Sequence, residues 1–152
     1  MNIVEMIDEK LVSFGFDAAS KDDVFEGLGK MMYDAGKVTD LNQYIKGLYA
    51  REAEFPTGMG NGIAIPHCKS DCVKEAAFTL VKLKNPVEWG SLDELPVDYV
   101  IMLAAPNTSD NVHLKMLSKL AANLMDDDFR ESLKDATDVA QIIDIFNKRK
   151  ED

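Results

Sequence analysis

The spacing of apolar residues along the chain predicts five helices. Apolar side chains recur every three or four positions in each, so they share one face of the helix. The predicted helices span residues 21–35, 41–54, 111–125, 129–135 and 139–148. Each is preceded or opened by residues whose side chains favour a helix N-terminus. These residues are Ser20, Thr39 or Asp40, Asp110, Asp126 to Asp128, and Asp138.

Short apolar runs without a helical period predict the strands. The run Val97–Ala105 is strongly apolar and short, which is typical of a central strand buried on both faces. Further strands are expected at 76–83 and 86–89, and another short apolar run covers 63–66. Because helices and strands interleave, the sequence predicts an α/β class, with one domain over residues 1–152 and a mixed sheet covered by helices.

The acidic composition narrows the choice of partners. The 152 residues include 17 Lys and Arg against 27 Asp and Glu, which gives a net charge of −10. Nucleic acid and anionic membrane surfaces attract basic proteins, so neither is expected as a partner. Any anion site in such a chain must be built from a few local groups.

The sequence also predicts a cytoplasmic protein. No apolar run approaches the roughly 20 residues that cross a bilayer, so direct membrane insertion is not expected. The first 16 residues carry charged side chains where a secretory signal needs an apolar core. Two cysteines do not make a disulfide framework, which fits a reducing compartment.

The two histidines of the chain stand in similar surroundings. His67 directly follows the apolar run 63–66, and His113 follows a second apolar run that ends at Pro106 and a short polar loop. Ligands of α/β proteins bind where strands end, so both rings are expected to meet in one crevice. His113 is also placed in the first turn of a helix, which favours a neutral ring or a bound anion. The alternative is that both are histidines without a role.

A glycine-rich loop and one arginine are candidates for binding an anion near these histidines. The loop is T-G-M-G-N-G over residues 57–62, and glycines allow backbone amides to approach an anion closely. Arg51, at the end of a predicted helix, offers a planar clamp for phosphate. The alternatives are a plain turn for the loop and an ion pair of Arg51 with Glu52 or Glu54. Lys69 and Lys115 are weaker candidates.

Cys68 and Cys72 form a C-x₃-C pair beside His67. The spacing matches no strong zinc signature, so two ordinary reduced thiols are favoured over a metal site. A hydrolase that uses Cys68 and His113 is a further hypothesis, although no oxyanion motif accompanies the thiol. We expect neither a metal nor a cofactor.

Two motifs resemble a known family. The stretch R-E-A-E-F-P-T-G-M-G-N-G-I-A-I-P-H over residues 51–67 resembles the phosphorylation-site region of fructose/mannitol-type enzyme IIA domains of the bacterial sugar phosphotransferase system. The segment A-A-P at 104–106, followed by H-L-K at 113–115, is similar to the second-histidine segment of that family. The resemblance implies a mixed sheet of about five strands with helices on both faces.

The resemblance also implies a phosphocarrier function and a role for each motif residue. His67 matches the phosphorylated histidine, His113 the assisting histidine, and Arg51 the arginine that stabilises the phosphoryl group. The matching phosphate-binding loop contributes Thr57, Gly58, Gly60 and Asn61. The implied partners are the phosphohistidine carrier HPr as donor, a cysteine of enzyme IIB as acceptor, and indirectly the membrane enzyme IIC.

Three functions follow as hypotheses. Residues 51–57 and Ile65–Cys68 look like galactitol-type enzyme IIA proteins, whereas Ala104–Pro106 with His113 looks more like the fructose type, so the leading hypothesis is a phosphocarrier in sugar or hexitol uptake. A regulatory nitrogen-type enzyme IIA, whose phosphorylation state controls partner proteins, is the alternative. The third hypothesis is a Cys/His or metal-assisted hydrolase.

Overall fold

The helices begin and end close to the residues that the sequence indicates. The computed structural model describes residues 3–108 and 111–149. Two short 3-10 turns, η1 (Val4–Met6) and η2 (Glu9–Leu11), precede the first strand. The α-helices are α1 (Lys21–Asp34), α2 (Leu41–Glu54), α3 (Val112–Leu124), α4 (Asp127–Asp135) and α5 (Val139–Asn147). Within the described ranges, none of the helices combines the length and apolarity needed to cross a membrane.

Capping side chains explain why the sequence indicates the starts of these helices. The side chains of Ser20, Asp40, Asp126 and Asp138 each accept a hydrogen bond from the backbone N–H three residues along the chain. These bonds satisfy N–H groups that the first turn of a helix leaves without a partner. At the second helix the cap is therefore Asp40 rather than Thr39. The predicted cap Asp110 lies outside the described residues.

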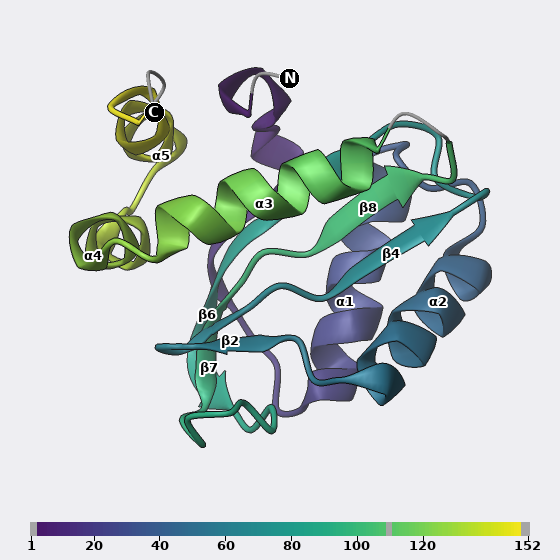
Figure 1. Ribbon diagram of the computed structural model, residues 1–152, viewed down its shortest axis with the longest axis horizontal. Helices are drawn as coiled ribbons and strands as arrows, with labels where there is room; N and C mark the ends of the chain where they lie inside the picture. The colour runs from purple at the N-terminus through teal and green to yellow at the C-terminus, as the bar shows by residue number, and fades with distance from the viewer. Residues whose placement is uncertain (1–2, 109–110, 150–152) are drawn as a thin grey trace.

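The predicted mixed sheet is present, and the structure divides it into two parts (Figure 1). Five strands form one part in the order β1-β6-β7-β3-β2, and three form the other in the order β4-β8-β5. The strands are β1 (Val12–Phe16), β2 (Gly58–Gly60), β3 (Ile63–Ala64), β4 (His67–Ser70), β5 (Ala77–Phe78), β6 (Leu80–Val87), β7 (Val97–Val100) and β8 (Leu103–Pro106).

Hydrogen bonds join the two parts across the break. Backbone N–H groups of Thr79, Ile101 and Leu103 donate to the carbonyls of Met102, Ala64 and Pro66, at 2.9 Å in each case. Strands β3 and β4 thus follow one another along the same path, as do β7 and β8. Both pairs are parallel, β3 to β7 and β4 to β8. Proline lacks an N–H, which is consistent with a break in the strand at residue 66.

The strand boundaries differ from the sequence-based ones in several places. The run 97–105, expected as one central strand, is divided between β7 and β8, and β2 and β4 are strands where none was expected. The run 76–83 is divided between β5 and β6, and the separate strand expected at 86–89 is the end of β6. Strand β1 was not predicted. It pairs with β6 at the edge of the larger sheet, and its sequence V-S-F-G-F alternates apolar with small residues over only five positions.

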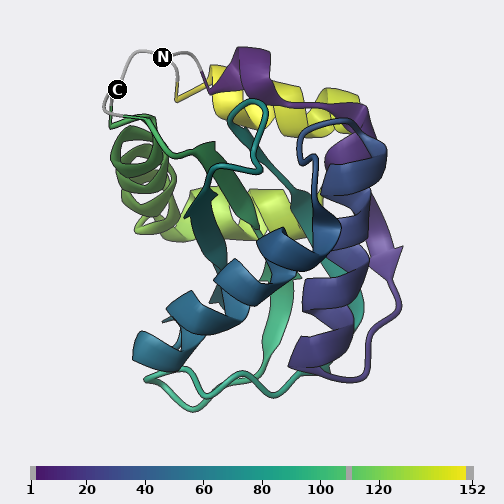
Figure 2. The same ribbon diagram turned by 90° about the vertical axis from the view of Figure 1, so that its right-hand side faces the viewer.

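Apolar side chains alternate between two cores, one on each face of the sheets. Leu80, Tyr99 and Leu103 belong to the core under α3, α4 and α5, whereas Val81 and Val100 belong to the core under α1 and α2. This alternation follows from the two-residue period of a strand. Figure 1 shows α3 on one face with α1 and α2 on the other, and Figure 2 shows the strands between them.

Helix α2 lies very close to β4. A Cβ atom placed on Gly47 would come within 2.3 Å of the Cys68 Sγ, so no larger residue fits at position 47 without a shift of the helix or the thiol. The Tyr44 hydroxyl donates to the Leu103 carbonyl at 2.8 Å and ties the same helix to β8. This packing brings the C-terminal turn of α2, which carries Arg51, beside the start of β4, which carries His67.

Candidate functional site

His67 is the first residue of β4 and lies directly after Pro66. Its ring is buried, with 7% of the residue exposed. The Nδ1 atom lies 2.7 Å from the Ile65 carbonyl oxygen. A carbonyl only accepts hydrogen bonds, so we assign the ring proton to Nδ1. In the neutral ring the lone pair is then on Nε2, and the Arg51 Nε–H donates to that atom at 3.1 Å.

Arg51 is held at both ends of its guanidinium group. Besides its bond to His67, its Nη1 donates to the Phe55 carbonyl at 2.9 Å. The ion pair with Glu52 or Glu54, which the sequence left open, is not formed. Among the ion pairs of residues 3–108 and 111–149, none includes Arg51. The guanidinium group is therefore aimed at the histidine rather than neutralised by a carboxylate.

The second histidine faces the first. His113 lies in the first turn of α3, and its ring centroid is 5.1 Å from that of His67, with 44° between the ring planes. The expectation that the two rings meet in one crevice is confirmed. The His113 Nδ1 atom is buried and has no hydrogen-bond partner among the described residues.

The surroundings of both histidines lower their pKa values from the ordinary 6.5, which favours the neutral ring at neutral pH. Burial lowers the pKa of His67, and the Arg51 guanidinium lowers it further, while the bond to the Ile65 carbonyl acts in the opposite direction. Burial also lowers the pKa of His113, with smaller contributions from His67, Lys69 and Arg51. A neutral imidazole whose lone pair carries no proton is a nucleophile without the help of a separate base.

Two cavities reach His67. One, of about 480 Å³, is lined mainly by apolar groups, including the exposed side chains of Phe55, Met59 and Leu92. The other, of about 360 Å³, is more polar and is lined by Arg51, Lys69 and His113 among others. Both cavities include Arg51 and His67, so a group bound to the ring is near the arginine from either side.

The glycine loop is only partly at the site. Thr57 and Gly58 line the larger cavity together with His67. Gly60 and Asn61 instead lie at the turn between β2 and β3 and line a separate cavity of about 440 Å³. The structure therefore brings Thr57 and Gly58 to His67 but leaves Gly60 and Asn61 apart from it.

Two amides of this loop are already bound to carboxylates. The Thr57 N–H donates to Glu52 at 2.8 Å, and the Asn61 N–H donates to Asp93 at 2.8 Å. A carboxylate oxygen takes the place that an incoming anion would need, so these two amides do not form the anion cradle that the glycine pattern suggested. Glu52 was missed as a functional candidate. Its only signal in the sequence was its position beside Arg51, which suggested an ion pair between the two side chains.

The cysteines offer little support for a hydrolase. Both thiols are free and buried, and burial raises the pKa of Cys68 to about 11. The thiol is therefore protonated at neutral pH, whereas the thiolate is the nucleophilic form. Within the described part of the chain, no three His, Cys, Asp or Glu residues are grouped as metal ligands.

The lowered pKa of His67 gives a testable pH dependence. We expect an NMR titration of the unphosphorylated protein to place the His67 midpoint below the ordinary value of 6.5. The folded ring then binds a proton less readily than the unfolded one. The free energy of unfolding should consequently decrease as the pH falls from 6.5 through the folded pKa. A midpoint at or above 6.5 would contradict the burial argument, and His67→Ala identifies the resonance.

Comparison with known proteins identifies the family. The family model described as "Phosphoenolpyruvate-dependent sugar phosphotransferase system, EIIA 2" matches residues 5–149. The chain is 34% identical over 148 residues to the fructose-specific EIIABC component of Bacillus subtilis, covering 97% of this chain and 23% of that protein. It thus spans about a quarter of the length of this relative. It is also 32% identical over 137 residues to the fructose-specific EIIA component of Haloferax volcanii, covering 90% and 89% of the two chains.

A solved structure agrees with these sequence matches. The nitrogen regulatory protein IIA-Ntr from Neisseria meningitidis superposes with a TM-score of 0.87 at 28% identity, covering 95% of this chain and 98% of that one. The chain therefore belongs to the EIIA 2 family of the phosphoenolpyruvate-dependent sugar phosphotransferase system, whose EIIA components are phosphotransferase proteins with a phosphohistidine intermediate.

Proposed function

We propose that the protein is a phosphocarrier that accepts a phosphoryl group from HPr on the Nε2 atom of His67 and passes it to a cysteine of enzyme IIB. One observation carries this proposal. The Ile65 carbonyl holds the ring proton on Nδ1, so the Nε2 lone pair is left facing Arg51 and the two cavities.

The transfer needs little covalent chemistry from the protein. The Arg51 Nε–H first gives up its hydrogen bond to Nε2 and turns to a phosphoryl oxygen. The freed Nε2 lone pair then attacks phosphorus, a bond forms from Nε2 to phosphorus, and the bond from phosphorus to the donor histidine nitrogen of HPr breaks. The donor nitrogen keeps that electron pair. His67 retains its Nδ1 proton, whose positive charge the Ile65 carbonyl stabilises at 2.7 Å. In the second step the thiolate of enzyme IIB attacks phosphorus and Nε2 regains its lone pair.

Arg51 and His113 are the groups placed to stabilise the transferred phosphoryl group. The Arg51 guanidinium already donates to the atom that would be phosphorylated, and its donors suit phosphoryl oxygens. His113 stands 5.1 Å from His67, ring to ring, and its unpartnered Nδ1 is free to interact with a phosphoryl oxygen. In a chain of net charge −10 these local groups offset an unfavourable average field.

The partners would approach along the apolar wall of the larger cavity. His67 is only 7% exposed, so a donor or acceptor residue must enter a cavity to reach it. Phe55, Met59 and Leu92 are exposed at this wall and offer apolar contact area to a protein partner. Transfer to membrane enzyme IIC would be indirect, through enzyme IIB.

The decisive test is phosphorylation by the purified phosphotransferase chain. Incubation with phosphoenolpyruvate, enzyme I and HPr should add one acid-labile, base-stable phosphoryl group, located on His67 by mass spectrometry. A fructose-type and a galactitol-type enzyme IIB then serve as alternative acceptors. The two fructose-specific relatives favour faster transfer to the fructose-type acceptor. Absence of phosphorylation, or label on another residue, would overturn the proposal.

A regulatory function is the second candidate. The similarity to the Neisseria nitrogen regulatory protein, with a TM-score of 0.87, favours it because the same fold serves that protein. Both functions would use the same phosphorylated histidine. A phosphorylated protein that transfers to no enzyme IIB, but changes its affinity for another partner protein, would support the regulatory function over transport.

His113→Ala should separate acceptance of the phosphoryl group from its delivery. We expect the variant still to be phosphorylated by HPr but to deliver the group to enzyme IIB roughly tenfold to a hundredfold more slowly. The reason is that a hydrogen bond to a charged group contributes about 1.5–3 kcal/mol. Single-turnover transfer rates measure the effect, with Lys119→Ala, an exposed change on the same helix, as the control. Stable phosphorylation of His113 itself would contradict this role.

A further inference from the structure

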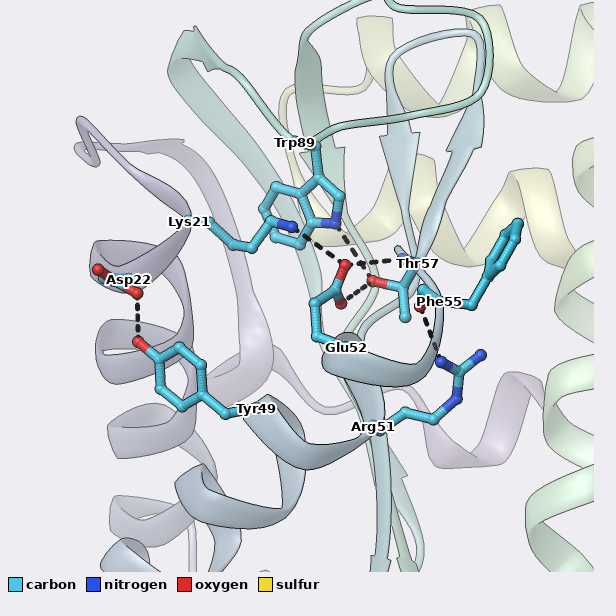
Figure 3. A network of polar contacts seen from close by, with 8 residues as sticks. All are labelled: Lys21, Asp22, Tyr49, Arg51, Glu52, Phe55, Thr57 and Trp89. Atoms are coloured by element: carbon cyan, nitrogen blue, oxygen red, sulfur yellow. Dashed lines mark hydrogen bonds and ion pairs between the residues drawn. The ribbon is translucent and has the colours of Figure 1, made fainter.

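A buried carboxylate lies behind the site, at the end of α2 that carries Arg51. The Glu52 side chain is 8% exposed and accepts three hydrogen bonds. Its donors are the Thr57 N–H at 2.8 Å, the Thr57 hydroxyl at 2.6 Å and the Lys21 ammonium at 3.1 Å. Figure 3 shows these contacts converging on the carboxylate between α1 and the loop that follows α2.

Thr57 is fixed from a further side by Trp89. The indole Nε1–H donates to the Thr57 hydroxyl oxygen at 3.2 Å (Figure 3). Trp89 is 2% exposed, and the Lys21 ammonium lies 5.1 Å from the centroid of its ring. The hydroxyl therefore both donates to Glu52 and accepts from Trp89. Each hydrogen-bonding group of this buried threonine side chain has a partner, which leaves the loop little freedom.

From Thr57 the hydrogen bonds continue to the reactive ring. The Thr57 carbonyl accepts from the Ile65 N–H at 3.0 Å, and the Ile65 carbonyl accepts from the His67 Nδ1–H at 2.7 Å. A continuous series of contacts thus runs from Glu52 through Thr57 and Ile65 to the imidazole. The Ile65 carbonyl is the group that fixes the His67 tautomer, and the N–H of the same residue is bound to Thr57.

The same loop also fixes Arg51. Residues 55–57 connect α2 to β2, and the Phe55 carbonyl accepts from Arg51 Nη1 at 2.9 Å. Anchoring Thr57 to Glu52 restricts where this carbonyl can lie. Figure 3 shows the arginine and Phe55 on one side of the loop and Glu52 on the other. One carboxylate therefore constrains both ends of the contact between Arg51 and His67.

We propose that Glu52 and Thr57 are positioning residues for phosphoryl transfer, which hold the His67 tautomer and the Arg51 guanidinium in the reactive arrangement. This inference rests on the proposed function for its kinetic part. The Thr57 N–H and hydroxyl both donate to Glu52, which leaves neither of them as a donor to a phosphoryl group. Thr57, which matches a residue of the family's phosphate-binding loop, thus acts on His67 and Arg51 by fixing the loop that contacts them.

The carboxylate form of Glu52 is required by its donors. Three hydrogens point at its two oxygens, one of them from a cation. A glutamine amide has one acceptor oxygen and presents its own hydrogens at the other position. Glu52→Gln would therefore turn an N–H group of its own toward the donor of either Thr57 or Lys21, while the side chain keeps its volume.

The experiment compares Glu52→Gln, Thr57→Val and Thr57→Ser with the wild-type protein. Valine keeps the shape of threonine but lacks the hydroxyl, and serine restores it. Tyr49→Phe is the matched control, because it removes a 2.5 Å bond to Asp22 between α1 and α2 without touching the loop (Figure 3). Three quantities are measured: the ¹⁵N shifts of the His67 ring, the single-turnover rate with phospho-HPr at varied HPr concentration, and the melting curve.

We expect the ring shifts of Glu52→Gln and Thr57→Val to move from the Nδ1–H form toward a mixture of tautomers. The maximal rate should fall by up to about a hundredfold, because small misplacements of reacting groups have effects of that size. The HPr concentration for half-maximal rate should change little, since Thr57 is only 5% exposed and the Glu52 side chain only 8% exposed. Thr57→Ser should return toward wild type, and Tyr49→Phe should stay there.

Folded variants that keep the wild-type tautomer and rate would overturn the inference. A fall in rate with unchanged ring shifts, matched by Tyr49→Phe, would assign Glu52 and Thr57 a purely structural role. If Thr57→Val does not fold, Glu52→Gln still decides the question. If the wild-type protein accepts no phosphoryl group, the proposed function fails, and the ring shifts alone still report whether Glu52 and Thr57 position His67.

Discussion

His67→Ala is expected to abolish phosphorylation by phospho-HPr. The variant removes the one ring whose Nε2 lone pair faces Arg51 and both cavities. His113 does not replace it, because its ring centroid lies 5.1 Å away and the Arg51 Nε–H is directed at His67. The measurement is incorporation of label from phosphoenolpyruvate in the presence of enzyme I and HPr, followed by localisation of the label.

The control for this variant is His113→Ala, which should still accept the group under the same conditions. Correct folding of His67→Ala is checked by its melting curve. Acid-labile label that persists undiminished in His67→Ala would show that the nucleophile is another residue. In that case the Ile65 carbonyl would have only a structural role toward the His67 ring.

Arg51→Ala should lower the rate of phosphoryl transfer by about 10²–10³, which corresponds to about 2.7–4 kcal/mol for the loss of one preorganised donor at a transition state. Arg51→Lys should recover only part of this rate. The guanidinium donates simultaneously to His67 Nε2 and to the Phe55 carbonyl, and a single ammonium group does not reproduce this fork. Single-turnover rates with phospho-HPr give the comparison.

Stability distinguishes the chemical role of Arg51 from a structural one. We expect the melting temperature to change little, because an accessible charge contributes about 1 kcal/mol or less to folding. Lys46→Ala removes an exposed cation from the same helix and should leave the rate unchanged. A wild-type rate in Arg51→Ala would remove the arginine from the site, and a large melting loss would make its role structural.

The helices could be predicted because their signals are local. Periodic apolar residues mark the helices, and a capping side chain marks the start of α1, α2 and α5, where Ser20, Asp40 and Asp138 cap as expected. Strand pairing depends on distant residues, which explains why the division of the sheet and the edge strand β1 were not predicted. Nothing near Val12 in sequence indicates that it pairs with Leu80.

The candidate site shows the same difference between local signals and contacts of distant residues. His67 and His113 could be placed together because each follows an apolar run that predicts a strand. The run before His67 contains β3 and continues into β4, and β4 is the neighbour of β8. The role of the glycine loop could not be predicted, because the partner of the Asn61 amide is Asp93, 32 residues away. The contacts of Glu52 were not predicted either: Lys21 is 31 residues away, and although Thr57 is only five residues away, it reaches Glu52 because the chain turns back after α2.

The close contact between Gly47 and the Cys68 sulfur makes the thiol a reporter of local opening. Both cysteines of the chain are buried, and α2 covers Cys68 so tightly that even a methyl group at position 47 would collide with it. Cys68 is 7% exposed and lines the more polar cavity beside His67, so an alkylating reagent reaches its sulfur more readily when α2 separates from β4. The labelling rate of Cys68 therefore reports how often α2, which carries Arg51, separates from β4, which carries His67. A lower labelling rate after phosphorylation would show that the bound group holds the helix and the strand together.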